Sequence, residues 1–162
     1  MHATATAILL FSHGSVLCGA EQNLLELAAR MRSRGDAPIV EVGFLNYTEP
    51  TFAQAVARCL EAGARRIVVA PYFLIAGKFV TEDLARTIAE EQGRNPSIEL
   101  VVADVIGFHE SLADAVLASA GEARPPRAWR DTMRHASAYC REHPKCPLYG
   151  TDVCHIHTGA VA

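Results

Sequence analysis

The sequence predicts an α/β fold, a three-layer parallel sheet of about four strands with helices on both faces. Short, continuous apolar runs alternate with segments whose apolar residues recur at helical spacing. Continuous apolar runs are typical of strands buried on both faces of a parallel sheet. Such sheets bind ligands beyond the carboxyl ends of their strands, so the loops that follow the strands are the candidate functional segments.

The first half of the chain predicts two strand–helix pairs. The apolar run 7–11 predicts the first strand, and turn-forming residues follow it. A helix is expected over 21–34, and a second strand over 39–45. The next helix is expected over 50–62, because Pro50 suits a first helical turn.

The second half continues the same alternation. The strongest strand is expected over 65–73, followed by a helix over 81–92. A fourth strand is expected over 98–102, and a helix over 110–120. Breaker residues over 121–126 then precede a last helix, expected over 128–141, and an irregular end follows from 142.

Composition limits the class of protein. The chain has 162 residues and a formal net charge of −3, which suits one globular domain and gives no basic excess for nucleic acid. Its apolar runs are too short to span a membrane, and its start lacks the basic region of a signal peptide. We therefore expect a cytoplasmic protein, with an α/β domain over 1–125 and a C-terminal helix and Cys/His-rich tail over 126–162.

A histidine stands just beyond the first predicted strand. His13 is followed by Gly14, which lets a ligand approach the backbone closely. A neutral imidazole binds a metal or accepts a proton near pH 7. The alternative is a structural role, in which the imidazole caps the next helix or bonds a carbonyl. The loop has no phosphate-binding glycine pattern and no nucleophile elbow, which argues against nucleotide hydrolysis and acyl transfer.

Four segments, in order over roughly residues 7–118, resemble the sirohydrochlorin chelatases of the CbiX and SirB type. The matching segments are 9–15 with His13-Gly14-Ser15, 42–51 with Glu49-Pro50, 64–77 with Pro71-Tyr72-Phe73-Leu74, and 107–112 with Gly107-Phe108-His109. The resemblance implies one half of a chelatase fold. It also implies a homodimer that inserts Co²⁺, Fe²⁺ or Ni²⁺ into sirohydrochlorin or a related tetrapyrrole without nucleotide, for cobalamin- or siroheme-type cofactors.

The resemblance also implies roles for particular residues. His13 would be the catalytic group, either holding the metal or accepting a pyrrole proton, and His109 would be a further metal ligand. The alternative for His109 is a position at the start of a helix. The implied substrate-binding residues are Ser12, Gly14, Ser15, Asn46, Gly77 and Lys78, of which Lys78 could equally be a solvated surface lysine.

Two positions depart from the family pattern. Phe79 occupies the place of a second histidine after the glycine of the third-strand loop, and Asn46 occupies the place of a glutamate after the second strand. Phenylalanine cannot bind a metal, and asparagine cannot act as a base. A second hypothesis is therefore a non-catalytic paralogue that binds tetrapyrrole or metal without inserting one into the other.

The C-terminal tail concentrates potential metal ligands. Three of the five cysteines and four of the seven histidines follow residue 134. Thiolates in a reducing compartment suit zinc or an iron–sulfur cluster. The candidate ligands are Cys140, Cys146, Cys154, His155 and His157. The alternatives are an irregular tail with incidental cysteines, and a tail whose histidines collect metal for the cleft. A third hypothesis for the whole protein is a cluster carrier for electron transfer or sensing.

Overall fold

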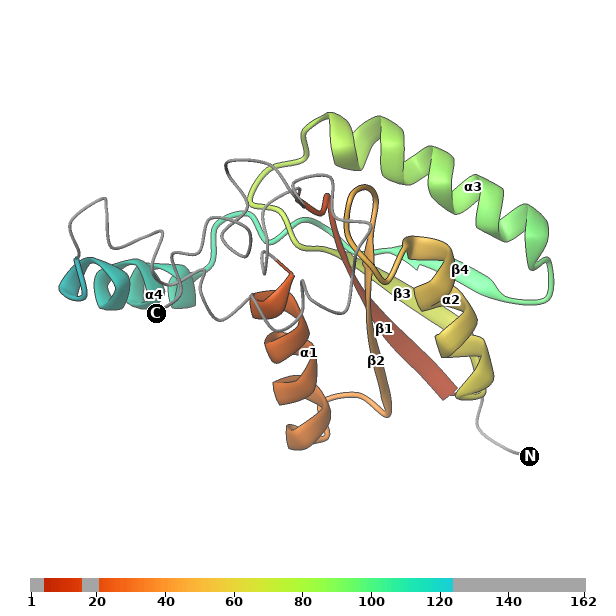
Figure 1. Ribbon diagram of the computed structural model, residues 1–162, viewed down its shortest axis with the longest axis horizontal. Helices are drawn as coiled ribbons and strands as arrows, with labels where there is room; N and C mark the ends of the chain where they lie inside the picture. Colours follow the sequence, from red (N-terminus) through yellow and green to blue (C-terminus); the bar gives the residue numbers. More distant parts are fainter. Residues whose placement is uncertain (1–4, 16–20, 124–162) are drawn as a thin grey trace, which may run out of the picture. The chain divides into compact units, whose positions relative to one another are not determined.

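The computed structural model describes residues 5–15 and 21–123 (Figure 1). Within them, 5–14 and 22–108 form one compact unit, and 15, 21 and 109–123 belong to a second. The first unit carries the sheet. The predicted helix over 128–141 and the Cys/His-rich tail lie outside the described residues.

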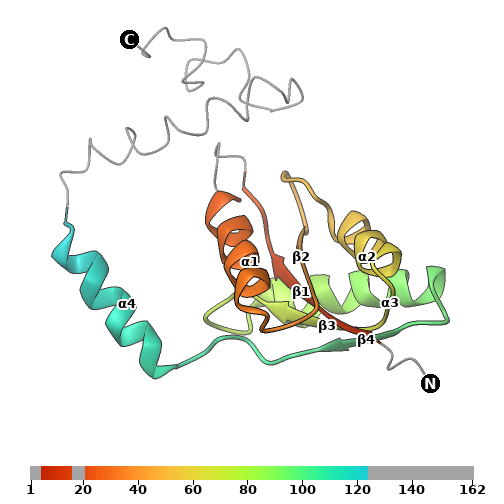
Figure 2. The ribbon, with the colours of Figure 1, turned by 90° about the horizontal axis from the view of Figure 1, so that it is seen from below.

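The sheet of the first unit has four parallel strands. They are β1 (Ala5–Ser12), β2 (Ile39–Phe44), β3 (Ala64–Pro71) and β4 (Glu99–Val102). Their order is β2-β1-β3-β4, with β1 and β3 in the interior of the sheet (Figures 1 and 2). Parallel strands in this order need crossover helices, and these follow β1, β2 and β3. The predicted parallel α/β sheet is confirmed.

Helices cover both faces of this sheet, as predicted. Helix α1 (Gln22–Arg34) packs on one face, where Leu24 and Ala28 join a cluster with Leu10 of β1. Helices α2 (Phe52–Glu61) and α3 (Ala85–Arg94) cover the opposite face, in a cluster that contains Leu9 and Phe11 of β1. Because successive residues of β1 are buried on opposite sides, this strand is the centre of the core.

The start of α2 differs from the prediction. Thr51 is the N-cap: its hydroxyl accepts a hydrogen bond from the Gln54 backbone N–H at 3.3 Å. The Gln54 side chain accepts in return from the Thr51 N–H at 2.8 Å, which completes a capping box. Pro50 therefore precedes the cap, joined to Glu49 by a cis peptide bond, and the prediction that Pro50 lies in the first turn is wrong.

The third helix begins earlier than predicted and in a wider form. The π-helical turn η1 (Phe79–Leu84) precedes α3 and continues directly into it. The carbonyl of Gly77 accepts hydrogen bonds from the backbone N–H groups of Val80 and Thr81, at 2.9 and 3.0 Å. Thr81 adds a bond from its hydroxyl at 3.3 Å. Phe79 thus lies in the first turn, at the carboxyl end of the sheet.

The second unit contributes one described helix, α4 (Glu110–Gly121). His109 is its N-cap, since its Nδ1 accepts a hydrogen bond from the Ser111 N–H at 3.2 Å. None of the residues of α4 is buried. Among the described residues, no helix is long and apolar enough to cross a membrane.

Candidate functional site

The loops after β1, β2 and β3 are joined at the carboxyl end of the sheet by backbone hydrogen bonds. The N–H groups of Leu45 and Asn46 donate to the carbonyls of Ser12 and His13, at 3.0 and 2.9 Å. The N–H of Tyr72 donates to the carbonyl of Phe11 at 2.7 Å. These bonds extend the parallel pairing beyond the strands, so residues from three loops are held at one edge.

Gly14 allows the first two loops to approach closely. Its φ is +84°, a conformation that side chains rarely adopt. A Cβ at this position would lie 1.9 Å from the backbone oxygen of Asn46. Only glycine fits this contact, and the contact fixes the position of His13 relative to Asn46.

The imidazole of His13 has its two nitrogens in different surroundings. Nδ1 lies 2.9 Å from the Gly14 carbonyl oxygen, which can only accept, so Nδ1 carries the proton. In the neutral ring Nε2 then keeps its lone pair. The Asn46 Nδ2 lies 3.5 Å from Nε2, at the long limit of a hydrogen bond. His13 thus presents a nitrogen lone pair that can bind a metal or accept a proton.

Two aromatic rings lie against the imidazole. The Phe79 ring lies 4.1 Å from that of His13, centroid to centroid, and the Tyr47 ring lies 5.8 Å away at 64°. Phe79 also packs on Phe73 at 6.3 Å, and Phe73 contacts the buried Phe11 at 5.9 Å. A row of rings therefore connects His13 with the core of the sheet.

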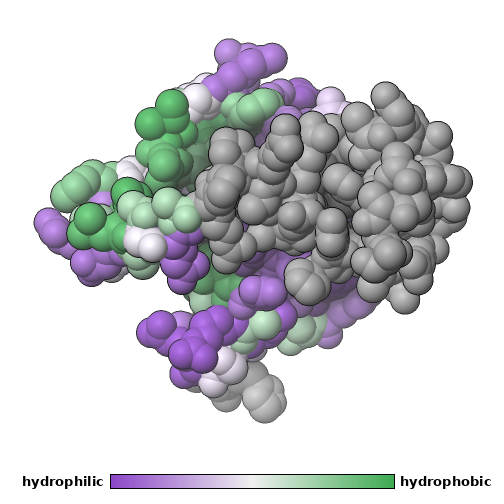
Figure 3. Space-filling model, turned by 60° about the vertical axis from the view of Figure 1, so that its left-hand side comes forward, coloured by the Kyte–Doolittle hydropathy of each residue, from purple (hydrophilic) through white to green (hydrophobic). Residues whose placement is uncertain are grey.

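The loops after β2 and β3 carry exposed apolar side chains. Figure 3 shows clusters of hydrophobic residues on the described surface. Of the exposed apolar residues, four belong to the loops after β2 and β3 and Phe79 begins η1; Ile75 is 76% exposed. We call them the apolar rim: Tyr47, Tyr72, Leu74, Ile75 and Phe79. An exposed apolar group beside a polar donor is typical of a ligand-binding surface.

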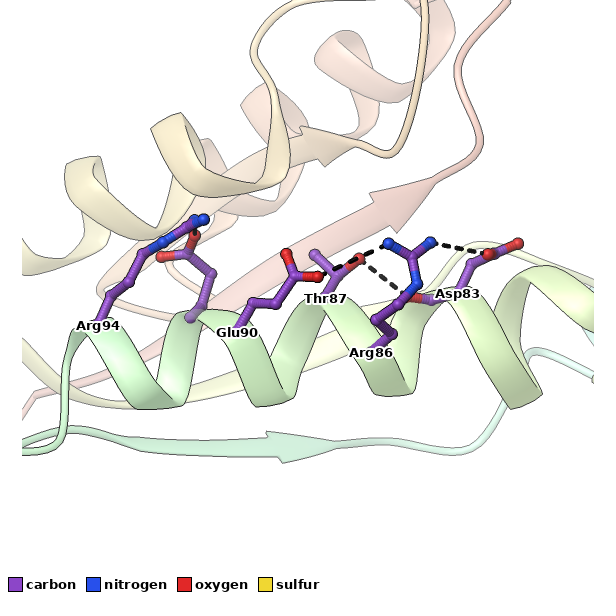
Figure 4. A network of polar contacts seen from close by, with 6 residues as sticks. Asp83, Arg86, Thr87, Glu90 and Arg94 are labelled. Atoms are coloured by element: carbon purple, nitrogen blue, oxygen red, sulfur yellow. Dashed lines mark hydrogen bonds and ion pairs between the residues drawn. The ribbon is translucent and has the colours of Figure 1, made fainter.

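Polar contacts brace the segment that carries Phe79. The Arg86 guanidinium lies 3.0 Å from the Asp83 carboxylate and 3.7 Å from that of Glu90 (Figure 4). The Thr87 hydroxyl donates to the Asp83 backbone oxygen at 2.8 Å. These contacts cross the junction between η1 and α3. They link the wide turn to the regular helix that follows it.

The structure gives the positions of several predicted site residues in the first unit, and their roles in binding stay predictions. Ser12 ends β1, Asn46 contacts the imidazole, and Gly77 and the exposed Lys78 precede η1. Ser15 and His109 belong to the second unit, and their predicted roles in substrate and metal binding stay predictions. Cys140, Cys146, Cys154, His155 and His157 lie outside the described residues.

Sequence reasoning missed Tyr47 and the packing role of Phe79. Tyr47 has a φ of 61°, an uncommon conformation for a residue with a side chain, and it is exposed beside His13. The available signal was its position directly after Asn46 in a strand-end loop. Phe79 stood out only as a residue in the place of a histidine, whereas the structure shows its ring against the imidazole.

Comparison with known proteins identifies the family. The CbiX family model matches residues 7–123. The chain belongs to the CbiX family. This CbiX protein is similar to the sirohydrochlorin cobaltochelatase of Methanocaldococcus jannaschii, with 42% identity over 82 residues that cover 51% of this chain and 57% of the relative. It is also similar to the sirohydrochlorin ferrochelatase of Priestia megaterium, with 29% identity over 68% of this chain and 42% of the relative.

Solved structures confirm the fold of the CbiX protein. The sirohydrochlorin chelatase SirB from Bacillus subtilis subspecies spizizenii, in complex with cobalt, superposes with a TM-score of 0.67 at 28% identity. That match covers 80% of this chain and 59% of SirB. SirB from Bacillus subtilis with Fe³⁺ gives a TM-score of 0.65 over 71% of this chain and 46% of SirB. The chain thus spans less than two thirds of the length of these relatives.

Proposed function

We propose that this CbiX protein inserts a divalent metal, Co²⁺, Fe²⁺ or Ni²⁺, into sirohydrochlorin or a related tetrapyrrole in cobalamin- or siroheme-type cofactor synthesis. The observation that carries the proposal is the lone pair of His13 Nε2, presented at the carboxyl end of the sheet beside the apolar rim. The relatives' names support it, since they are sirohydrochlorin cobaltochelatases and ferrochelatases.

The reaction exchanges two pyrrole protons for one metal ion. Two pyrrole N–H bonds would break as the metal passes to the macrocycle nitrogens, and His13 Nε2 would give the metal an electron pair while the macrocycle is bound. Asn46 and Tyr47 beside the imidazole are exposed, so water reaches this position and can carry the protons away. Lys78, which is exposed before η1, would contact a carboxylate of the macrocycle. Backbone groups near Ser12, Gly14 and Gly77 would contribute further contacts.

The deciding experiment is anaerobic insertion of Co²⁺, Fe²⁺ and Ni²⁺ into sirohydrochlorin, followed by absorbance. Wild-type protein should exceed the non-enzymatic rate with at least one metal, and His13→Ala should return the rate to background. Circular dichroism of His13→Ala checks that the fold is kept. Insertion at the background rate with all three metals would contradict the enzyme and favour the binding paralogue.

The second candidate function is a non-catalytic protein that binds tetrapyrrole or metal. The contact of Phe79 with His13 favours it, because a ring without a donor atom occupies this side of the imidazole. Binding of sirohydrochlorin measured by fluorescence quenching, without insertion, would distinguish it from the enzyme.

We further propose a cluster or zinc in the tail, a homodimer and a cytoplasmic location. Cys140, Cys146 and Cys154 with His155 or His157 would supply the ligands for an iron–sulfur cluster or zinc, in a C-terminal segment that begins near residue 126. Iron, sulfide and zinc analysis of anaerobically purified protein tests this, with Cys146→Ser as the comparison. Light scattering tests the dimer, and fractionation of cells tests the location.

A further inference from the structure

We propose that the His13 site takes the metal only together with the macrocycle, so that tetrapyrrole binds first and His13 becomes the single axial protein ligand. This inference rests on the proposed function and specifies its order of binding. The inference concerns the described residues around His13 Nε2, and the tail is a separate candidate metal-binding segment.

The neighbours of Nε2 do not form a site for a free cation. The described contacts of the imidazole are with the Asn46 amide and the rings of Tyr47 and Phe79, and none of these is a carboxylate or a thiolate. Within the described part of the chain, no group of three or more His, Cys, Asp or Glu side chains could hold a metal ion. Protein-held metal sites ordinarily use three or four such ligands. A single imidazole would bind a hydrated divalent ion only weakly.

Asn46 opposes a free cation further. Its Nδ2 lies 3.5 Å from Nε2, the atom that a metal would need. The Asn46 backbone is fixed by two hydrogen bonds, from its N–H to the His13 carbonyl at 2.9 Å and from the Thr48 N–H to its carbonyl at 2.7 Å. Only the exposed side chain can turn away. An incoming ion must therefore displace this amide, and the amide offers no negative charge in exchange.

A bound macrocycle supplies what the protein lacks. Its four nitrogens provide donors in one plane, and the loss of two protons gives them a double negative charge. One of the two axial positions outside this plane would then take the imidazole. The apolar rim offers contacts to a flat ring that need no metal, through exposed groups such as Leu74 and Ile75. The affinity for the macrocycle therefore does not depend on the metal, whereas the affinity for the metal depends on the macrocycle.

The closing experiment compares metal binding at His13 without the macrocycle and with it. Co²⁺ is titrated into metal-free wild-type protein and into His13→Ala by anaerobic calorimetry, so that binding in the tail contributes equally to both. No His13-dependent binding is expected at Co²⁺ concentrations that give half-maximal insertion. His13-dependent binding of Co²⁺ in the absence of macrocycle would overturn the proposal.

Cobalt(II)-sirohydrochlorin then probes the His13 site with metal and macrocycle both bound. Electron paramagnetic resonance of its complex with wild-type protein should show hyperfine splitting from one axial nitrogen, and His13→Ala should lose it. Absence of this splitting in the wild-type complex would also overturn the proposal. Metal-free sirohydrochlorin should bind wild-type protein and His13→Ala alike, and Ile75→Ser more weakly. Leu27→Ser, which changes an exposed apolar residue of α1, is the matched control.

A gain-of-binding variant completes the test. Asn46→Glu combined with Phe79→His should strengthen His13-dependent Co²⁺ binding without macrocycle by about tenfold or more. If a correctly folded variant binds Co²⁺ no more strongly, then Asn46 and Phe79 are not what limits the binding of free Co²⁺ at His13. The insertion assay tests the reaction and the Co²⁺ titration tests only the free site, so failure of the proposed function and failure of this inference are distinguishable.

Discussion

The imidazole of His13 lies against the phenyl ring of Phe79, with their centroids 4.1 Å apart and their planes tilted by 40°. The same phenyl ring packs on Phe73, which contacts Phe11 in the core. The bond from Nδ1 to the Gly14 carbonyl fixes one edge of the imidazole. Packing and hydrogen bonding together therefore orient Nε2.

Removal of the Phe79 ring should loosen the site without unfolding the protein. Phe79→Ala loses a partly exposed aromatic contact, and we expect the free energy of unfolding to fall by about 1 kcal/mol. The insertion rate should fall further than this loss explains, because His13 is no longer held. Phe79→Leu, which keeps an apolar contact, should lie closer to wild type. Urea unfolding and the insertion assay measure the two effects, and an unchanged rate in Phe79→Ala would refute the positioning role.

Gly14 should tolerate no side chain. Gly14→Ala places a methyl group in a left-handed conformation and against the Asn46 backbone oxygen. Gly35→Ala is the matched control, since Gly35 also has a positive φ, +73°, but a Cβ there meets nothing within 4 Å. The control should lose about 1–2 kcal/mol of unfolding free energy. Gly14→Ala should lose more, together with its activity. Equal losses in the two variants would show that the contact with Asn46 does not matter.

The arrangement of elements was predictable because it depends on local patterns of burial. The continuous apolar run that contains Leu9 and Phe11 indicates a strand buried on two faces, and the structure confirms it. Strand-end location likewise pointed to His13 and the family resemblance to Asn46, and the structure brings the two residues together. The π-helical turn at Phe79 was missed, because its hydrogen bonds compete with those of a regular helix over a difference too small to read from composition.

The capping box of α2 should contribute measurably to stability. Thr51→Ala removes the hydroxyl that accepts from the Gln54 N–H, and we expect a loss of about 1 kcal/mol in the free energy of unfolding. Thr51→Ser keeps the acceptor and should remain near wild type. Thermal or urea unfolding of the two variants provides the measurement. A loss in Thr51→Ser as large as that in Thr51→Ala would attribute the effect to the missing methyl group instead.

Cys59 should remain a neutral thiol well into the alkaline range. Burial in the core, with a smaller effect of the Glu41 carboxylate, raises the pKa of Cys59 to about 12. In the unfolded chain a thiol ionises near pH ~8.5. Between these values the folded state holds a proton that the unfolded state has released. Stability from this group is therefore complete below the unfolded pKa and is lost as pH rises above it, by at most about 1.4 kcal/mol per pH unit.

Two measurements check this expectation. Urea unfolding at pH values from 7 to about 10 should show a steeper alkaline loss in wild type than in Cys59→Ala, which lacks the titrating thiol. Cys59→Ala should itself be less stable at neutral pH, because the fully buried sulfur leaves a cavity. Iodoacetamide with peptide mapping, which separates Cys59 from the other cysteines, should label it only after denaturation. Rapid labelling of Cys59 in the native protein, or parallel pH slopes in the two proteins, would contradict its burial as a neutral thiol.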